Sequence, residues 1–253
     1  KAEFGVGIAR MEDRYFQTNI IDFSETKHDE STYSIFGGSI VLEGSTLNAR
    51  QFATQGSREK MAAQIFTGTE HFRSGVSKVT KGTPEPYKKV QSWLQVSYQN
   101  ETYHKVSPKF TLGAYLEAYY SSRNFSNNYT ATLMQAGEFT PTAHSKVTYN
   151  EAFRANQYAG VGAMPIYQLS ESFQLRGEFY GFIPIFPIKK DEYGQAYYGK
   201  AFTKFEYLGE ISLVFQLSFG SISAYVNHYS SPSNDWNVGL TLGWQLFNSR
   251  FVE

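Results

Sequence analysis

The sequence contains no cysteine among its 253 residues, which excludes disulfide bonds and any zinc site built on thiolates. It has no apolar run close to the roughly 20 residues that a membrane-spanning helix needs. Its 23 Lys and Arg residues balance its 23 Asp and Glu residues, so the net charge is zero. Without a basic patch, there is no electrostatic reason to expect a nucleic-acid partner. No signal peptide is found at Lys1, so we expect an exported protein to carry its signal further upstream.

Catalytic motifs are also missing. A serine hydrolase with a nucleophile elbow needs a Gly-x-Ser-x-Gly turn that presents its nucleophile, and the nearest stretches, "GGSIV" and "QGSRE", do not fit. The histidines are scattered without the spacing of a metal site. They are His28, His71, His104, His144 and His228. We therefore predict no catalytic residue, no metal ion and no cofactor in this chain.

Aromatic residues are abundant, at 17% of the chain, although the mean hydropathy is negative. The stretch "WNVGLTLGWQLF", residues 236–247, alternates apolar and small or polar side chains throughout its length. A period of two indicates a β-strand with two different faces. A run of about ten such residues with aromatics at both ends is also what a tilted strand needs to cross a bilayer.

The same alternation recurs along the chain and predicts about ten strands. In residues 202–217, for example, Glu206 and Glu210 share a polar face opposite Ile211 and Leu213. The expected strands are 3–16, 33–47, 58–70, 88–100, 109–121, 157–168, 172–185, 202–217, 220–230 and 236–247.

The links between these strands alternate in length. The short links are 48–57, 100–108, 169–172 and 218–220, and the long polar links are 22–32, 71–87, 122–156 and 187–201, with a brief last one at 230–235. Bacterial outer-membrane barrels have short turns at one end and longer loops at the other. We therefore predict one all-β domain over residues 1–253, a transmembrane antiparallel β-barrel. A soluble lipocalin-like barrel or sandwich is the alternative.

Two groups of stretches resemble known barrels. Residues 43–66, "EGSTLNARQFATQGSREKMAAQIF", resemble the strand, turn and strand of the outer-membrane insertase and translocase superfamily, also called the bacterial surface antigen superfamily. "AFRANQYAGVGAMPIYQL", "EFYGFIPIFPI" and "AYYGKAFTKFEYLGEIS" look like the barrel of Bacteroidetes patatin-like phospholipases. The resemblance implies a sixteen-stranded barrel, of which these strands are the C-terminal part, or else a shortened relative. It also implies a patatin lipase domain and a POTRA domain upstream.

The resemblance further implies a pair of site residues. Arg154 takes the place of the superfamily's signature arginine, which lies on a long loop folded into the barrel and pairs with an acid. Ala155 replaces the following glycine, Asn156 replaces the aromatic residue, and the matching strand offers Glu178 as the acid. Other polar residues predicted to face the interior are Glu117, Arg176, Glu206 and Glu210. They form either a permeation path or the wetted inner wall of the barrel.

The expected function is to anchor and translocate the upstream lipase domain in the outer membrane of a Gram-negative bacterium, with no enzymatic activity in this chain. Expected partners are outer-membrane lipid, the upstream domains and further copies of the chain. A stand-alone porin or uptake barrel is the second hypothesis. A hydrolase on the outer rim is the third, since His228 lies close in sequence to Ser230 and Asp235. Ser and Asp, however, are common in any turn.

Overall fold

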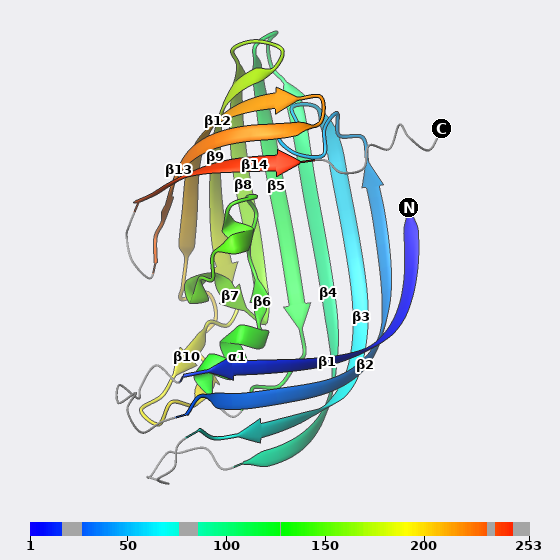
Figure 1. Ribbon diagram of the computed structural model, residues 1–253, viewed down its shortest axis with the longest axis vertical. Coiled ribbons are helices and arrows are strands. Elements are labelled where there is room, and N and C mark those ends of the chain that lie inside the picture. The colour runs from blue at the N-terminus through cyan, green and yellow to red at the C-terminus, as the bar shows by residue number, and fades with distance from the viewer. Residues whose placement is uncertain (17–26, 76–85, 127, 232–235, 245–253) are drawn as a thin grey trace.

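The computed structural model describes residues 1–16, 27–75, 86–126, 128–231 and 236–244. Ten long strands form one antiparallel sheet in the order β1-β2-β3-β4-β5-β8-β9-β12-β13-β14 (Figure 1). Their bounds are β1 Ala2–Tyr15, β2 Asp29–Ser45, β3 Gly56–Arg73, β4 Tyr87–Lys105, β5 Phe110–Ser121, β8 Gln157–Gln168, β9 Phe173–Pro184, β12 Glu206–Leu217, β13 Gly220–Tyr229 and β14 Trp236–Trp244. The predicted all-β class and antiparallel strands are therefore confirmed.

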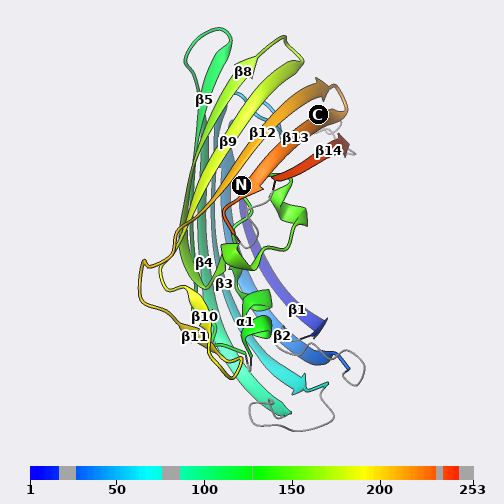
Figure 2. The same cartoon turned by 90° about the vertical axis from the view of Figure 1, so that its left-hand side faces the viewer.

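The sheet is strongly curved and has a concave and a convex face (Figures 1 and 2). β1 and β14 are its two edges, and no pairing joins them among the described residues. The ten strands thus form an open arc instead of the closed barrel expected from the sequence. Closure requires hydrogen bonds between the first and last strands, and here each edge strand has a single neighbour.

Side chains alternate between the two faces as predicted. In β12, Glu206, Glu210 and Ser212 are buried on the concave face, whereas Tyr207, Ile211 and Leu213 are exposed on the convex face. β5 and β9 follow the same rule. Because paired residues of neighbouring strands lie on the same face, the apolar sides of the strands join into one continuous convex surface.

Some strand bounds differ from the expected ones. β12 begins at Glu206 instead of residue 202, because Phe202 has a φ of 56° in the preceding turn. β4 continues to Lys105, five residues beyond its predicted end at residue 100. Residues 17–26 and 76–85 of the first two long links, residues 232–235 of the last link and residues 245–247 of the last predicted strand lie outside the described residues.

The long link 122–156, which we call the inner loop, lies on the concave side of the arc (Figure 2). It holds local structure that the sequence pattern did not predict: α1 (Tyr129–Gln135), β6 (Gly137–Glu138), β7 (Arg154–Ala155) and two 3-10 turns. Asn128 caps the N-terminus of α1, and its side chain accepts a hydrogen bond from the amide of Ala131 at 2.8 Å. A second link, 185–205, contains the small hairpin β10 (Ile188–Lys190) and β11 (Ala196–Tyr198).

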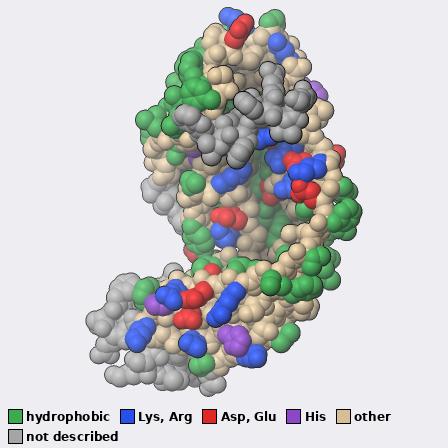
Figure 3. All heavy atoms as spheres, turned by 45° about the vertical axis from the view of Figure 1, so that its right-hand side comes forward, with side chains coloured by type: hydrophobic (Ala, Val, Ile, Leu, Met, Phe, Trp, Pro, Cys, Tyr) green, Lys and Arg blue, Asp and Glu red, His purple; other side chains and the backbone are tan. Residues whose placement is uncertain are grey.

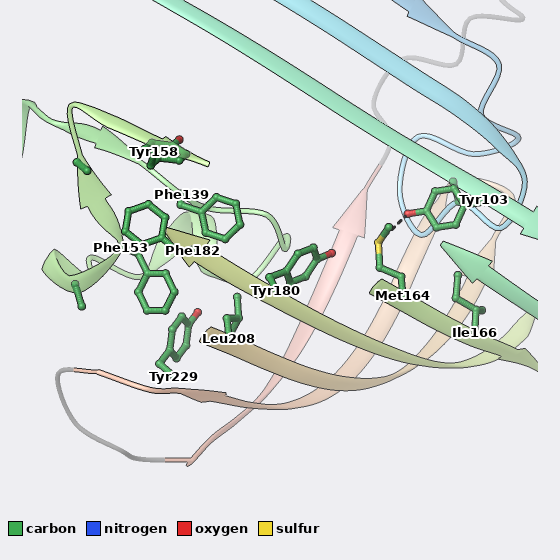
Figure 4. Packing of buried hydrophobic residues seen from close by; sticks show 13 residues of the cluster. Tyr103, Phe139, Phe153, Tyr158, Met164, Ile166, Tyr180, Phe182, Leu208 and Tyr229 are labelled. Carbon is green, nitrogen blue, oxygen red and sulfur yellow. Dashed lines mark hydrogen bonds between the residues drawn. The ribbon is translucent and has the colours of Figure 1, made fainter. Parts of the chain in front are cut away.

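An aromatic cluster packs the inner loop against the sheet (Figure 4). Phe139 and Phe153 come from the loop, and Tyr158, Tyr180 and Phe182 come from β8 and β9. The rings of Phe139 and Phe182 stack with centroids 5.5 Å apart. The apolar core therefore lies between the inner loop and the concave face, and the rest of that face is largely polar.

Candidate functional site

The concave face carries the polar residues that the sequence predicted for the interior. Glu117, Arg176, Glu178, Glu206 and Glu210 are all buried, with exposed fractions of 2% to 7%. They come from β5, β9 and β12, which lie side by side in the order β5-β8-β9-β12. The alternation of each strand directs them to the same face. Ionised groups at this depth need charged or hydrogen-bonding partners, and each of the five has at least one.

Arg176 and Glu178 form a buried ion pair within β9. Two further hydrogen bonds hold the guanidinium: one to the carbonyl of Ala53 at 2.8 Å and one to the hydroxyl oxygen of Tyr103 at 2.6 Å. Tyr180 donates to the other carboxylate oxygen of Glu178 at 3.1 Å. These partners replace water around both charges. A buried ion pair is tolerated only when such hydrogen bonds compensate for the loss of water.

Arg154 does not contact Glu178, which corrects the pair expected from the sequence. Its guanidinium lies 2.8 Å from the carboxylate of Glu138 and also donates to the carbonyls of Leu133 and Met134 at 3.3 and 3.2 Å. The reason is local, because β6 and β7 pair in a register that places Glu138 opposite Arg154. Glu178 already has Arg176 on its own strand.

His144, which the sequence pattern did not single out, forms a second buried contact with a carboxyl group. Its Nδ1 lies 2.6 Å from a carboxylate oxygen of Glu210, and its ring stacks on Tyr225 with centroids 3.6 Å apart. His144 belongs to the inner loop, and its partners belong to β12 and β13. No spacing rule reveals a pair that is 66 residues apart in sequence.

Arg123 attaches the other end of the inner loop. Its guanidinium lies 4.6 Å from the ring centroid of Trp93 and 5.1 Å from that of Tyr33, within cation–π range. It also donates to Gln135 at 2.7 Å. Burial lowers the pKa of Arg123, and the nearby acidic side chain of Glu70 opposes this effect. The rings of Trp93 and Tyr33 therefore hold the Arg123 cation away from water.

The inner loop spans the concave face from one side of the arc to the other. Near β1, Asn128 donates to the hydroxyl of Tyr15 at 3.0 Å and Gln135 donates to Asp13. Near β13, Asn150 donates to the carbonyl of Ser231 at 2.8 Å. The loop thus connects strands that the sheet itself keeps far apart.

The turn 46–55, between β2 and β3, makes a second connection at the short-link end. Its carbonyl at Phe52 accepts from Gln174 of β9 and Gln216 of β12, each at 3.2 Å. Ser221 of β13 donates to Gln51 at 3.0 Å. The turn also supplies the Ala53 carbonyl bound by Arg176. The turn therefore connects β2 and β3 on one side of the arc with β9, β12 and β13 on the other side.

Several polar atoms on the concave face of β12 and β13 have no hydrogen-bond partner among the described residues. They are Ser212 Oγ, Ser223 Oγ, Asn227 Oδ1 and Tyr229 Oη. Buried polar groups are almost always satisfied, by protein or by water. This part of the face therefore holds polar atoms that are open to hydrogen bonds from groups outside the described residues.

The two described residues of the rim-hydrolase hypothesis, Ser230 and His228, have other partners. Ser230 donates to Glu206 and accepts from the amide of Tyr207 at 2.9 Å. His228 lies between the rings of Tyr207 and Trp236, with centroids at 5.9 and 4.9 Å. No hydrogen bond joins His228 to Ser230 among the described residues, and Asp235 lies outside them.

Within the described part of the chain, no group of three or more His, Asp and Glu side chains is arranged to hold a metal ion. No helix described there is long and apolar enough to cross a membrane. No protein-family model, curated protein or solved structure matches the chain. The candidate site is therefore defined by its own geometry: a polar concave face, braced by the inner loop and the turn 46–55.

Proposed function

We propose that the chain forms the C-terminal ten strands of a transmembrane β-barrel in a bacterial outer membrane. The observation that carries this proposal is the contrast between the two faces of the sheet: the convex face is apolar and exposed, whereas the concave face buries charged residues of β5, β9 and β12 beside the aromatic cluster. One convex residue from each of the ten strands shows the pattern, with exposed fractions of 42% to 86%: Ile8, Ile40, Ile65, Leu94, Leu116, Val161, Phe179, Leu213, Ile222 and Leu240.

A soluble barrel would favour the opposite arrangement, with apolar side chains inside and polar ones outside. Contiguous exposed apolar surfaces of more than a few hundred Å² are rare on soluble monomers and mark contacts with other molecules or with membranes. A surface that extends over all ten strands fits a lipid bilayer, for which barrel strands alternate apolar-out and polar-in.

The unpaired edges of β1 and β14 are an argument that the complete barrel contains further strands. In hydrocarbon, an unpaired backbone N–H or C=O group costs several kcal/mol, because no water is present to bind it. β1 presents such an edge over 14 residues and β14 over 9. We propose that additional strands, preceding β1 as in the sixteen-stranded patatin-like barrels that the sequence resembles, pair with these edges.

The inner loop favours an anchor over a porin. It lies on the concave side, where a channel would run, and it is fixed to both β1 and β12 by buried contacts. Solutes that enter the barrel would therefore have to pass beside this attached loop. We therefore propose that the barrel anchors an upstream patatin-like lipase domain in the membrane and translocates it, and that the chain itself has no catalytic role.

Flotation with phospholipid vesicles tests the membrane proposal. The full-length protein, in which further strands are proposed to pair with β1 and β14, should float with the vesicles on a density gradient and remain bound in high salt and alkaline carbonate. A full-length protein that stays soluble and monomeric without detergent would contradict the proposal. In the full-length gene, a Gly-x-Ser-x-Gly sequence upstream supports the anchor, whereas a signal peptide directly before Lys1 supports the stand-alone porin.

A fluorophosphonate probe tests the catalytic part of the proposal. The chain in detergent micelles should remain unlabelled, since Ser230 is bonded to Glu206 and not to a histidine. Labelling that disappears in Ser230→Ala and in His228→Ala would instead support a rim hydrolase. Labelling at any other serine would also contradict an anchor without activity.

A further inference from the structure

The apolar band on the convex face ends abruptly on β1–β4. Strand register sets the side chains in rows across these four strands, two residues or about 7 Å apart. One row contains Val6, Gly38, Ile65 and Leu94, and the row two steps further contains Arg10, Ser34, Thr69 and Val90. The row after that contains Glu12, Thr32, His71 and Lys88. The surface therefore changes from apolar to charged within three rows.

A groove with a volume of about 610 Å³ lies at this boundary. Its apolar walls come from Ile8, Phe36 and Val90, which are exposed by 86%, 52% and 69%. Short side chains between them, at Ser34 and Thr69, form the floor. The groove thus results from small residues placed between large ones on neighbouring strands.

Arg10 lines the charged end of the groove and has no hydrogen-bond or ion-pair partner among the described residues. Beyond it, the rows carry Arg14, Arg73 and Lys88, so the region has four Lys and Arg residues against two acids, Glu12 and Glu30. Arg14 is bonded to Glu12. Figure 3 shows charged and histidine side chains gathered on the lower part of the molecule, beside hydrophobic ones. The groove therefore ends in an excess of positive charge.

We infer that this groove binds an anionic membrane lipid, with its phosphate on Arg10 and an acyl chain along Phe36 and Val90. The inference rests on the proposed membrane function, because the groove lies on the face assigned to lipid. A guanidinium binds phosphate oxygens through two parallel hydrogen bonds, and Arg10 is free to do so. A phospholipid carries an apolar acyl chain and an anionic phosphate in one molecule, and these match the apolar walls and the arginine of the groove. A neighbouring protein would need both features in the same arrangement.

Native mass spectrometry of the chain in zwitterionic micelles tests the inference. Phosphatidylglycerol and phosphatidylcholine with identical acyl chains are supplied together, and the lipid retained by the protein is counted. Phosphatidylglycerol should be preferred about fivefold, as expected for one cation acting on an anionic head group. Arg10→Gln should abolish the preference. Arg50→Gln, in the exposed turn at the other end of the strands, should keep it.

A second variant and a soluble competitor test the acyl contact. Ser34→Leu fills the floor of the groove without changing any charge, and it should reduce retention of both lipids. Glycerophosphoglycerol, which has the head group but no acyl chains, should not compete. Efficient competition would show that the site binds free phosphate and would overturn the lipid assignment.

Equal retention of the two lipids by the unmodified chain, or equal losses in Arg10→Gln and Arg50→Gln, would overturn the inference. Flotation of the full-length protein separates this failure from failure of the proposed function. A chain that floats but shows no lipid preference disproves the groove and leaves the barrel standing. Failure of the full-length protein to float would disprove both.

Discussion

Arginine placed on the convex face should destabilise the protein in lipid far more than it does in water. Ile65 lies on β3 beside Gly38 and Leu94, with 64% of its surface exposed. In water, only the buried third of the Ile65 side chain contributes hydrophobic stabilisation. Full burial is worth roughly 1.5 to 3 kcal/mol, so Ile65→Arg should cost about 0.5 to 1 kcal/mol. In a bilayer, arginine at mid-depth costs about 2 to 4 kcal/mol.

His71→Arg is the matched control, because it lies on the same face of β3 but in the charged row. Its cost in lipid should be about 0 to 1 kcal/mol, as for a residue near the interface. Equilibrium unfolding from phospholipid vesicles, followed by tryptophan fluorescence, measures both variants. Costs that agree within about 0.5 kcal/mol would remove the assignment of this face to lipid, since the two positions are expected to differ by at least about 1 kcal/mol.

Three further predictions concern the inner loop and Gly56, the first residue of β3. In double-mutant cycles, Arg154→Ala and Glu138→Ala should couple by about 0.5 to 3 kcal/mol, whereas Arg154→Ala and Glu178→Ala should be additive; the reverse would restore the pair expected from the sequence. Gly56→Ala should lower the free energy of unfolding by at least about 1 kcal/mol, because φ is +90° and the added Cβ would lie 2.2 Å from a backbone oxygen; an unchanged unfolding midpoint would contradict this. Burial raises the pKa of Tyr129 to about 12, so the neutral phenol is favoured in the folded state and stability should fall as pH rises from about 10 to 12. Tyr129→Phe should reduce the slope of this part of the pH profile of unfolding, and an unchanged slope would exclude a contribution from Tyr129.

The strands could be predicted because their information is local. Alternation in "EYLGEISLVF" places Glu206 and Glu210 on one face and Ile211 on the other, whatever the neighbouring strands are. The sequence of links then gives the order of an antiparallel sheet in which neighbours in sequence pair. Strand ends were predicted less well, since a turn such as that at Phe202 depends on a backbone angle that the hydrophobic pattern does not encode.

The contacts of the concave face could not be predicted for the opposite reason. Glu210 meets His144 and Asp13 meets Gln135 only because the curvature of the sheet and the path of the inner loop bring distant segments together. Arg154 was assigned a partner by resemblance, but the two-residue pairing of β6 with β7 provides Glu138 at shorter range. The alternation within a strand shows that a polar residue faces inward. Which of several inward-facing residues becomes its partner depends on the three-dimensional path of the chain.

The bridge made by the turn 46–55 has a consequence for the order in which the molecule folds. Gln51 and Ser221 are 170 residues apart, and Phe52 and Gln216 are 164 apart, so neither contact can form until most of the chain has been synthesised. Hairpins between neighbouring strands close within microseconds, whereas contacts of large sequence separation require costly loop closure and form late. We therefore expect the strands to pair first and the arc to gain its final curvature in a slow last step, with φ-values near zero for substitutions at Gln51 and Ser221.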